Sequence, residues 1–160
     1  MLTPFKPSNW LMASVACVAA GVLVYAIGRP YAPQLIHTLL SRFDVTAQIL
    51  PSSALPLTYQ LPSFFHMLAM LLATVAVTRH QPKFQKPALI ITFILGITME
   101  FVQHPAVKKS LEACADTHAC SVFSDFTAYA LAGTFDRLDV LAIVLAAGIT
   151  SLLLWRSQTA

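Results

Sequence analysis

Three polar side chains, Glu100, Gln103 and His104, occur together near the end of an apolar stretch that begins at Pro87. In a helix, their spacing of i, i+3 and i+4 places them on one face, and Gly96 lies on that face one turn earlier, where a neighbouring helix can approach closely. A carboxylate inside an apolar span costs about 3 kcal/mol or more, so it normally faces a protein interior or a wet cavity. The pattern indicates either a polar pocket for a head group or a protonated ligand, or a contact that only holds helices together.

A second polar group opens the last apolar stretch of the chain, where Asp136, Arg137 and Asp139 occur. The two aspartates stand three residues apart at a helix start, which is almost a capping box. We therefore expect Asp136 to cap the helix, while Asp139, further into the span, points toward Glu100 and His66. Arg137 is a candidate counter-ion of these carboxylates, Glu100 included, or a phosphate contact. A lone histidine such as His66 is more often an interior residue than a ligand, but it lies at a depth similar to that of Glu100.

The composition is that of a membrane protein. Of the 160 residues, 57% are hydrophobic and 11% are charged, whereas about a quarter of the residues of a soluble domain are charged. Pro87 suits the first turn of a helix. Stretches long enough to cross a hydrocarbon core of about 30 Å are Trp10–Gly28, Phe64–Thr78 with flanks from Pro62 to His80, Pro87–Gln103 and Leu138–Trp155. We predict an all-α integral membrane bundle of four transmembrane helices, with residues 1–160 as a single domain.

The distribution of basic residues predicts the orientation of the spans. The first stretch is expected to be a retained anchor, because its apolar run is longer than that of a secretory signal and Arg29-Pro30 is a poor cleavage site. With four spans, both termini share a side with the loop Arg79–Lys86. Lysines and arginines near the span ends are equally numerous on the two sides, but three of them fall within this short loop. Because basic residues concentrate in cytoplasmic loops, we place both termini in the cytoplasm.

Both long outer loops are expected to carry a short interfacial helix. In the first loop, residues 29–61, the apolar positions of this helix are Leu35, Leu39 and Leu40. The loop continues with three prolines, Pro51, Pro56 and Pro62. They predict that the chain reaches the second span in an extended conformation. In the second loop, residues 104–136, the apolar face comes from Val122, Phe123, Phe126, Tyr129 and Ala130.

Two cysteines in the second outer loop, Cys114 and Cys120, are expected to form a disulfide in an oxidising periplasm. A zinc site that adds His118 is the alternative, but it has only three ligands and an unusual spacing. A reduced pair is expected if the orientation of the spans is the reverse.

Nothing in the sequence requires an enzyme, since it contains no G-x-S-x-G, no P-loop and no recognisable Ser/His/Asp order. A metal site from His66, Glu100 and His104 lacks a metal-specific spacing such as H-E-x-x-H, so we predict no metal and no cofactor. A membrane enzyme with His66 and Glu100 as acid and base on a lipid-linked phosphate is a weaker alternative. The net charge of +3 comes without a basic face, so no nucleic-acid partner is expected.

Three short segments together resemble the VanZ-like family of small bacterial membrane proteins. They are Pro62-Ser-Phe-Phe-His66, the Glu-x-x-Gln of Glu100 to Gln103, and Gly133-Thr-Phe-Asp-Arg-Leu-Asp139. The resemblance covers roughly residues 61–154, and it implies a four-helix bundle in the bacterial cytoplasmic (inner) membrane. The founding member of the family is linked to low-level resistance to the lipoglycopeptide teicoplanin. The chain departs from the commoner pattern in its long link between Gln103 and Asp136 and in Ile143, where an asparagine often stands.

The function that these observations predict is non-enzymatic. The polar cluster comprises His66, Glu100, Gln103, Asp136, Arg137 and Asp139. At the outer leaflet it is expected to bind a membrane lipid or a lipid-linked envelope precursor and so to modulate glycopeptide sensitivity. The alternative is an accessory or assembly subunit of a larger membrane complex, in which the cluster is structural. Its docking face would then be the first span, which is rich in small residues. The small-residue seam of that span, Ala13, Cys17 and Gly21, is expected to pack against another helix.

Overall fold

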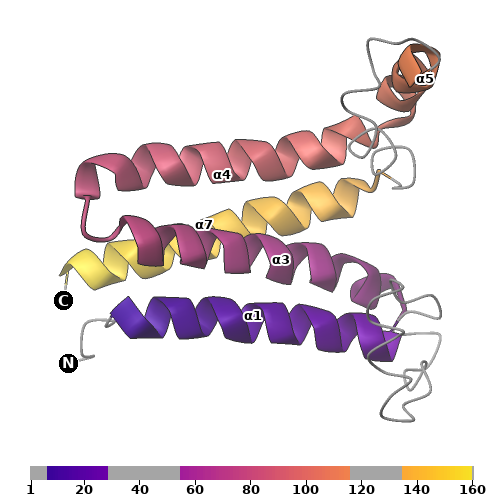
Figure 1. Ribbon diagram of the computed structural model, residues 1–160. Coiled ribbons are helices and arrows are strands. Elements are labelled where there is room, and N and C mark those ends of the chain that lie inside the picture. Colours follow the sequence, from indigo (N-terminus) through magenta and orange to yellow (C-terminus); the bar gives the residue numbers. More distant parts are fainter. Residues whose placement is uncertain (1–6, 29–54, 116–134, 160) are drawn as a thin grey trace.

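The computed structural model of the protein describes residues 7–28, 55–115 and 135–159, and nearly all of them are helical. The helices are α1 (Pro7–Gly28), α3 (Leu55–Thr78), α4 (Pro82–Val102), α5 (Pro105–Ala115) and α7 (Arg137–Thr159), numbered as in Figure 1. No strand occurs among these residues. The prediction of an all-α protein is therefore confirmed for the part of the chain that the structure describes.

The long helices α1, α3, α4 and α7 lie side by side, and successive ones run in opposite directions (Figure 1). Helix α3 is central, because it packs against each of the other three. Helix α5 leaves the end of α4 and lies beyond the ends of the long helices. The start of α3, the end of α4 and the start of α7 consequently lie at the same end of the molecule, which we call the α5 end.

Three helices are long and apolar enough to cross a membrane, over Gln60–Thr78, Pro82–Val102 and Arg137–Ser157. At about 1.5 Å per residue, such helices reach about 30 Å, the thickness of a hydrocarbon core. Helix α1 has 22 residues, and its segment Asn9–Val24 is a shorter apolar helix. Three of the four predicted spans thus have the length and composition of a transmembrane helix.

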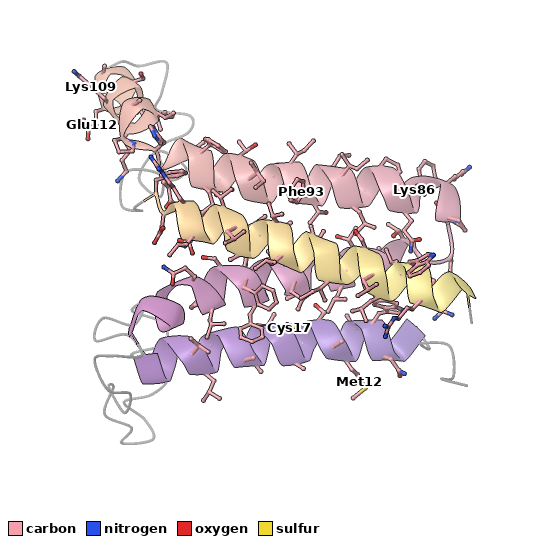
Figure 2. The ribbon with its side chains drawn as sticks, turned by 180° about the vertical axis from the view of Figure 1, so that it is seen from behind. Met12, Cys17, Lys86, Phe93, Lys109 and Glu112 are labelled. Atoms are coloured by element: carbon pink, nitrogen blue, oxygen red, sulfur yellow. The ribbon has the colours of Figure 1, made fainter. Side chains whose placement is uncertain are left out.

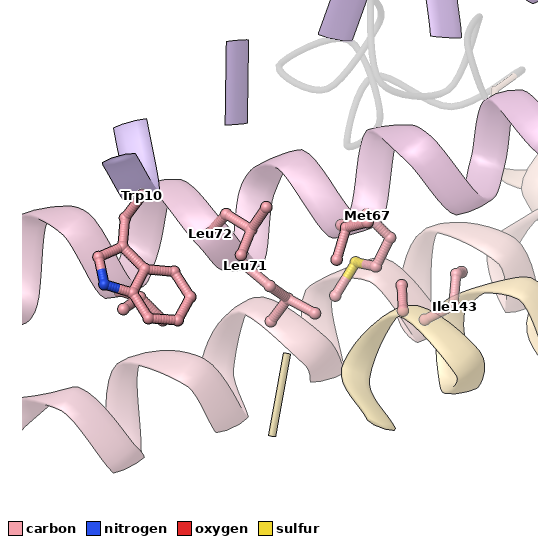
Figure 3. Close-up of a cluster of buried hydrophobic side chains, with 8 residues drawn as sticks. Trp10, Met67, Leu71, Leu72 and Ile143 are labelled. Atoms are coloured by element: carbon pink, nitrogen blue, oxygen red, sulfur yellow. The ribbon is translucent and has the colours of Figure 1, made fainter. Parts of the chain in front are cut away.

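The buried hydrophobic cluster is built mainly by α3, which supplies Met67, Leu68, Leu71, Leu72 and Val75. These positions recur every three or four residues and so share one side of the helix. Trp10 from α1 and Ile143 and Ala146 from α7 complete the cluster (Figure 3). The core therefore joins α1, α3 and α7.

Helix α4 lies outside this core, because none of its residues is buried. Leu89, Phe93 and Ile97 pack half-buried against the cluster. In contrast, its large apolar side chains Ile90, Ile91, Ile94 and Leu95 are more than half exposed. An apolar surface of this extent suits contact with lipid or with another apolar helix better than contact with water.

The small-residue seam of α1 packs against α3. Ala13 and Cys17 contact the hydrophobic cluster, and a Cβ atom added at Gly21 would lie 3.4 Å from Cβ of Phe65. Ser14 is buried beside this seam and donates a hydrogen bond from Oγ to the carbonyl oxygen of Ala69 over 2.8 Å. The seam is thus occupied by α3 within the chain, which agrees with its prediction as a packing surface.

The Ser14 hydrogen bond predicts a modest loss of stability on substitution. Interhelical hydrogen bonds in membrane proteins contribute about 0.6 kcal/mol on average and reach about 1.7 kcal/mol. Ser14→Ala is therefore expected to lower the free energy of unfolding by about 1 kcal/mol, measured by denaturation in detergent. Ser151→Ala is the matched control, because Ser151 is exposed and bonds only to Ala147 of its own helix. Equal losses for the two variants would contradict this account of the seam.

The helix boundaries near prolines differ from the prediction. Helix α3 begins at Leu55 and contains Pro62, so the extended path expected through Pro56 and Pro62 is wrong. Helix α4 has Pro82 in its first turn, and Pro87 lies inside it. A proline in the first turn removes an N–H group that has no partner in any case, and membrane helices tolerate interior prolines. The turn between the two helices shrinks to residues 79–81 and is closed by a hydrogen bond from Gln81 N to Thr78 O.

Helix α5 was not predicted, although Pro105 at its start is a proline at a first helical position. Three other predictions lie outside the described residues. They are the interfacial helix around Leu35–Arg42, the interfacial helix around Val122–Ala130, and the disulfide, for which neither Cys120 nor the side chain of Cys114 is described.

Candidate functional site

His66 and Glu100 line one cavity of about 390 Å³ between α3 and α4, which we call the α3–α4 cavity. Ser63 lies on the α3 wall, Gly96 on the α4 wall, and Ile143 of α7 contributes from a third helix. The prediction that His66 and Glu100 lie at similar depth thus agrees with the structure. The antiparallel course of the two helices produces this match, because positions near the start of one helix face positions near the end of the next.

Gly96 allows α3 to approach α4 beneath the cavity. A Cβ atom added at Gly96 would lie 2.7 Å from Sδ of Met67, closer than side chains pack. Further from the α5 end, the hydroxyl groups of Thr74 and Thr92 are hydrogen-bonded across the same pair of helices over 3.1 Å. The threonine bond links the two helices directly, whereas Gly96 makes room for the Met67 side chain at the wall of the cavity.

Glu100 is half-buried, and its Oε2 atom is fully buried with no hydrogen-bond partner among the described residues. The carboxyl groups of Asp139 and Asp136 are close enough to repel it electrostatically. The predicted counter-ion Arg137 is exposed and makes no ion pair with Glu100 within the described part of the chain. A buried acceptor without a donor is costly, so the carboxyl group of Glu100 is suited to bind a hydrogen-bond donor or a cation.

Asp136 caps α7, as predicted. Its Oδ1 accepts a hydrogen bond from Leu138 N over 2.9 Å, and its Oδ2 accepts one from Nε2 of Gln60 over 3.0 Å. Both carboxylate oxygens are therefore used within the chain, and the second bond ties the start of α7 to α3. Gln60 was not among the predicted site residues, because its segment was expected to be extended, although a lone amide between apolar residues is a usable signal.

Gln103 and His104 are not among the residues that line the α3–α4 cavity with Glu100, so a ligand-binding role for Gln103 stays a prediction. Helix α4 ends at Val102, and Gln103 is its buried C-cap residue, with a hydrogen bond from its N to Glu100 O. The His104 ring accepts a hydrogen bond at Nδ1 from Ala106 N over 3.3 Å. His104 therefore begins α5 and belongs to the α4–α5 corner.

The histidine, cysteine and carboxylate side chains of the described residues form no cluster of three that could hold a metal ion. The set of His66, Glu100 and His104 is not assembled, because His104 lies at the α4–α5 corner. The α3–α4 cavity therefore holds one imidazole and one carboxylate with an apolar surround, an arrangement suited to binding.

A second hollow lies between α3 and α7. This α3–α7 groove has a volume of about 420 Å³ and is lined by Gln60, Leu61, Phe64, Leu138, Leu141, Ala142 and Leu145. Gln60 is the one polar residue among its described lining residues, and the Gln60–Asp136 hydrogen bond lies at the α5 end of the groove. An apolar groove with one polar end is complementary to a lipid, because a lipid has an apolar chain and a polar head group.

Comparison with known proteins gives no relative: no protein-family model matches the chain, and neither a curated protein nor a solved structure matches it significantly. The described part of the chain is thus that of an all-α protein with helices long and apolar enough to span a membrane.

Proposed function

We propose that the chain is a VanZ-like protein of the bacterial cytoplasmic membrane that binds a lipid-anchored or envelope ligand in the α3–α4 cavity. The observation that carries this proposal is the buried Oε2 atom of Glu100, which has no described hydrogen-bond partner and lines a cavity together with His66. Such a carboxyl group is stabilised when a ligand supplies the donor. Binding would modulate the sensitivity of the cell to glycopeptides.

In the proposed topology the chain crosses the membrane four times and both termini are cytoplasmic. Helix α1, with 22 residues, would be about 33 Å long at 1.5 Å per residue, which matches the span length of its neighbours. The α5 end would then face the outer leaflet. Helix α5 would lie at the interface, since it carries Val107 and Leu111 beside Lys109 and Glu112 (Figure 2), the mixed pattern of an interfacial helix.

The ligand suggested by the site has a polar head and an apolar chain. The carboxyl groups of Glu100, Asp139 and Asp136 favour ammonium, amide or hydroxyl donors over a phosphate alone. The α3–α7 groove is a separate hollow next to Asp136, which bonds to Gln60 of its wall, and it offers apolar walls for an acyl or isoprenoid chain. A membrane lipid or a lipid-linked envelope precursor combines both features. The function is non-enzymatic, in keeping with a sequence that has no nucleophile motif.

Glycopeptide susceptibility tests this proposal in cells. Cells that express the protein are expected to change their teicoplanin susceptibility, and Glu100→Ala is expected to abolish the change at equal protein level. Glu112→Ala is the matched control, because Glu112 is an exposed carboxylate on α5. If the Glu100 variant matched the wild type in susceptibility and in every other envelope phenotype, the proposal would fail.

An accessory subunit of a membrane complex remains the second candidate, and the exposed apolar surface of α4 favours it. Ile90, Ile91 and Ile94 are each more than half exposed, and no residue of α4 is buried. A partner helix could cover this surface. Purification in mild detergent separates the two functions, because a subunit brings a stoichiometric partner protein whether or not Glu100 is intact.

A further inference from the structure

Three methionine side chains line the α3–α4 cavity, and they come from two helices. Met67 and Met70 lie on α3 and Met99 lies on α4, whereas the whole chain has five methionines. His66 lines the same cavity. Three thioether groups and one imidazole thus border one hollow.

We propose that the α3–α4 cavity binds a soft monovalent metal cation of the Cu(I) and Ag(I) class through methionine sulfur and the His66 imidazole. Thioether sulfur is a soft ligand that selects Cu(I), while oxygen ligands suit magnesium, calcium and manganese. Among the described residues that line the cavity, side-chain oxygens come from Ser63 and Glu100, so methionine sulfur outnumbers carboxylate groups there. The inference goes beyond the proposed envelope ligand, because it rests on the methionines and not on Glu100.

Packing holds the first of these sulfur atoms in place. Met67 is 2% exposed, and its Sδ lies against Gly96, where a Cβ atom would be only 2.7 Å away. Its backbone neighbour His66 is exposed on the same helix. On α4, Met99 lies three residues after Gly96, so it follows one turn later toward the α5 end. The glycine therefore lets the sulfur of one helix approach the helix that carries Met99.

The alternative role of these methionines is to fill an irregular gap between apolar helices, which flexible thioether side chains do well. A gap filler closes the space around it, and here a cavity of about 390 Å³ stays open beside the three side chains. Met70 is moreover 37% exposed.

A silver titration tests the inference, because Ag(I) has the ligand preference of Cu(I) and does not change oxidation state. The full chain in detergent, with Cys17→Ala, Cys114→Ser and Cys120→Ser to remove competing thiols, is titrated with silver nitrate in a calorimeter. We expect one strong site per chain. Met70→Leu combined with Met99→Leu is expected to weaken it by roughly 100-fold or more, since loss of a supporting contact alone costs about 10- to 100-fold.

Met12→Leu is the matched control, because Met12 is 71% exposed on α1 and points away from the other helices (Figure 2). Leucine conserves the volume of methionine, so the variants are expected to fold, which circular dichroism checks. In the Cu(I)-loaded protein, X-ray absorption at the copper edge should show sulfur neighbours. No strong silver site in the parent protein, equal affinity in the double variant, or copper without sulfur neighbours would each overturn the inference.

Two variants separate this inference from the proposed function. The double methionine variant is expected to lose silver binding, whereas Glu100→Gln is expected to lose any co-purifying lipid or envelope precursor. If no envelope ligand bound to the protein, the silver site would still be supported by the titration. If silver did not bind, the proposed envelope ligand would still be supported by co-purification.

Discussion

Alanine at Asp136 is expected to lower the free energy of unfolding by about 2 kcal/mol, the largest stability effect at the α5 end. The side chain accepts hydrogen bonds from Leu138 N and from Gln60. Loss of an N-cap costs about 1 kcal/mol, and the half-buried Gln60 amide left without an acceptor adds about 1 kcal/mol or more. Denaturation of the purified protein in detergent measures the sum.

Asp136→Asn is the control, because asparagine caps helices as well as aspartate does and Gln60 can turn its amide oxygen toward the asparagine NH₂ group. Its stability is expected to stay near that of the wild type. A double-mutant cycle with Gln60→Leu isolates the bond between α3 and α7. An equal loss in the asparagine and alanine variants would mean that the negative charge acts instead of the hydrogen bonds.

Leucine at Gly96 is expected to have the second large effect, on both stability and binding. The Cβ atom of the new side chain alone would lie 2.7 Å from the Sδ atom of the buried residue Met67. Either Met67 must therefore move into the α3–α4 cavity, or α4 must move away from α3. Overpacking of this kind costs about 1 to 3 kcal/mol. The same displacement reduces the space available to a ligand. The amount of ligand that co-purifies with the protein is therefore expected to fall.

Gly148→Leu is the matched control, since an added Cβ atom at Gly148 meets nothing within 4 Å. Replacement of a helical glycine there is expected to be neutral or to stabilise by up to about 1 kcal/mol, because glycine is the weaker helix former. If the two leucine variants unfolded alike, the close approach of α3 to α4 at Gly96 would be wrong.

The position of His66 and Glu100 at one cavity could be predicted from the sequence, because it needs only the count of spans and the distance of each residue from a span end. The helix ends could not be predicted as well. Proline rules from soluble proteins placed boundaries at Pro62 and Pro87, but both prolines lie inside helices, where apolar surroundings leave the chain no competing partner for its backbone groups.

The remaining errors follow from where α4 stops. The sequence predicts a helix that continues to His104, but the helix ends at Val102, and His104 lies at the start of α5. The hydrogen bond between Gln60 and Asp136 could not be predicted, because the two residues are 76 positions apart. A bond of this kind depends on how α3 and α7 pack.

The most direct test of the central claim is a native-detergent purification of tagged wild-type protein and Glu100→Gln, with mass spectrometry of bound lipids and proteins. A hydrogen bond to a charged group contributes about 1.5 to 3 kcal/mol. The affinity of the variant for the ligand is therefore expected to be at least about tenfold lower than that of the wild type. We expect a lipid or envelope precursor with the wild type that is lost from Glu100→Gln. A stoichiometric protein partner that appears equally with both, and no lipid that depends on Glu100, would contradict the account and assign Glu100 to helix packing.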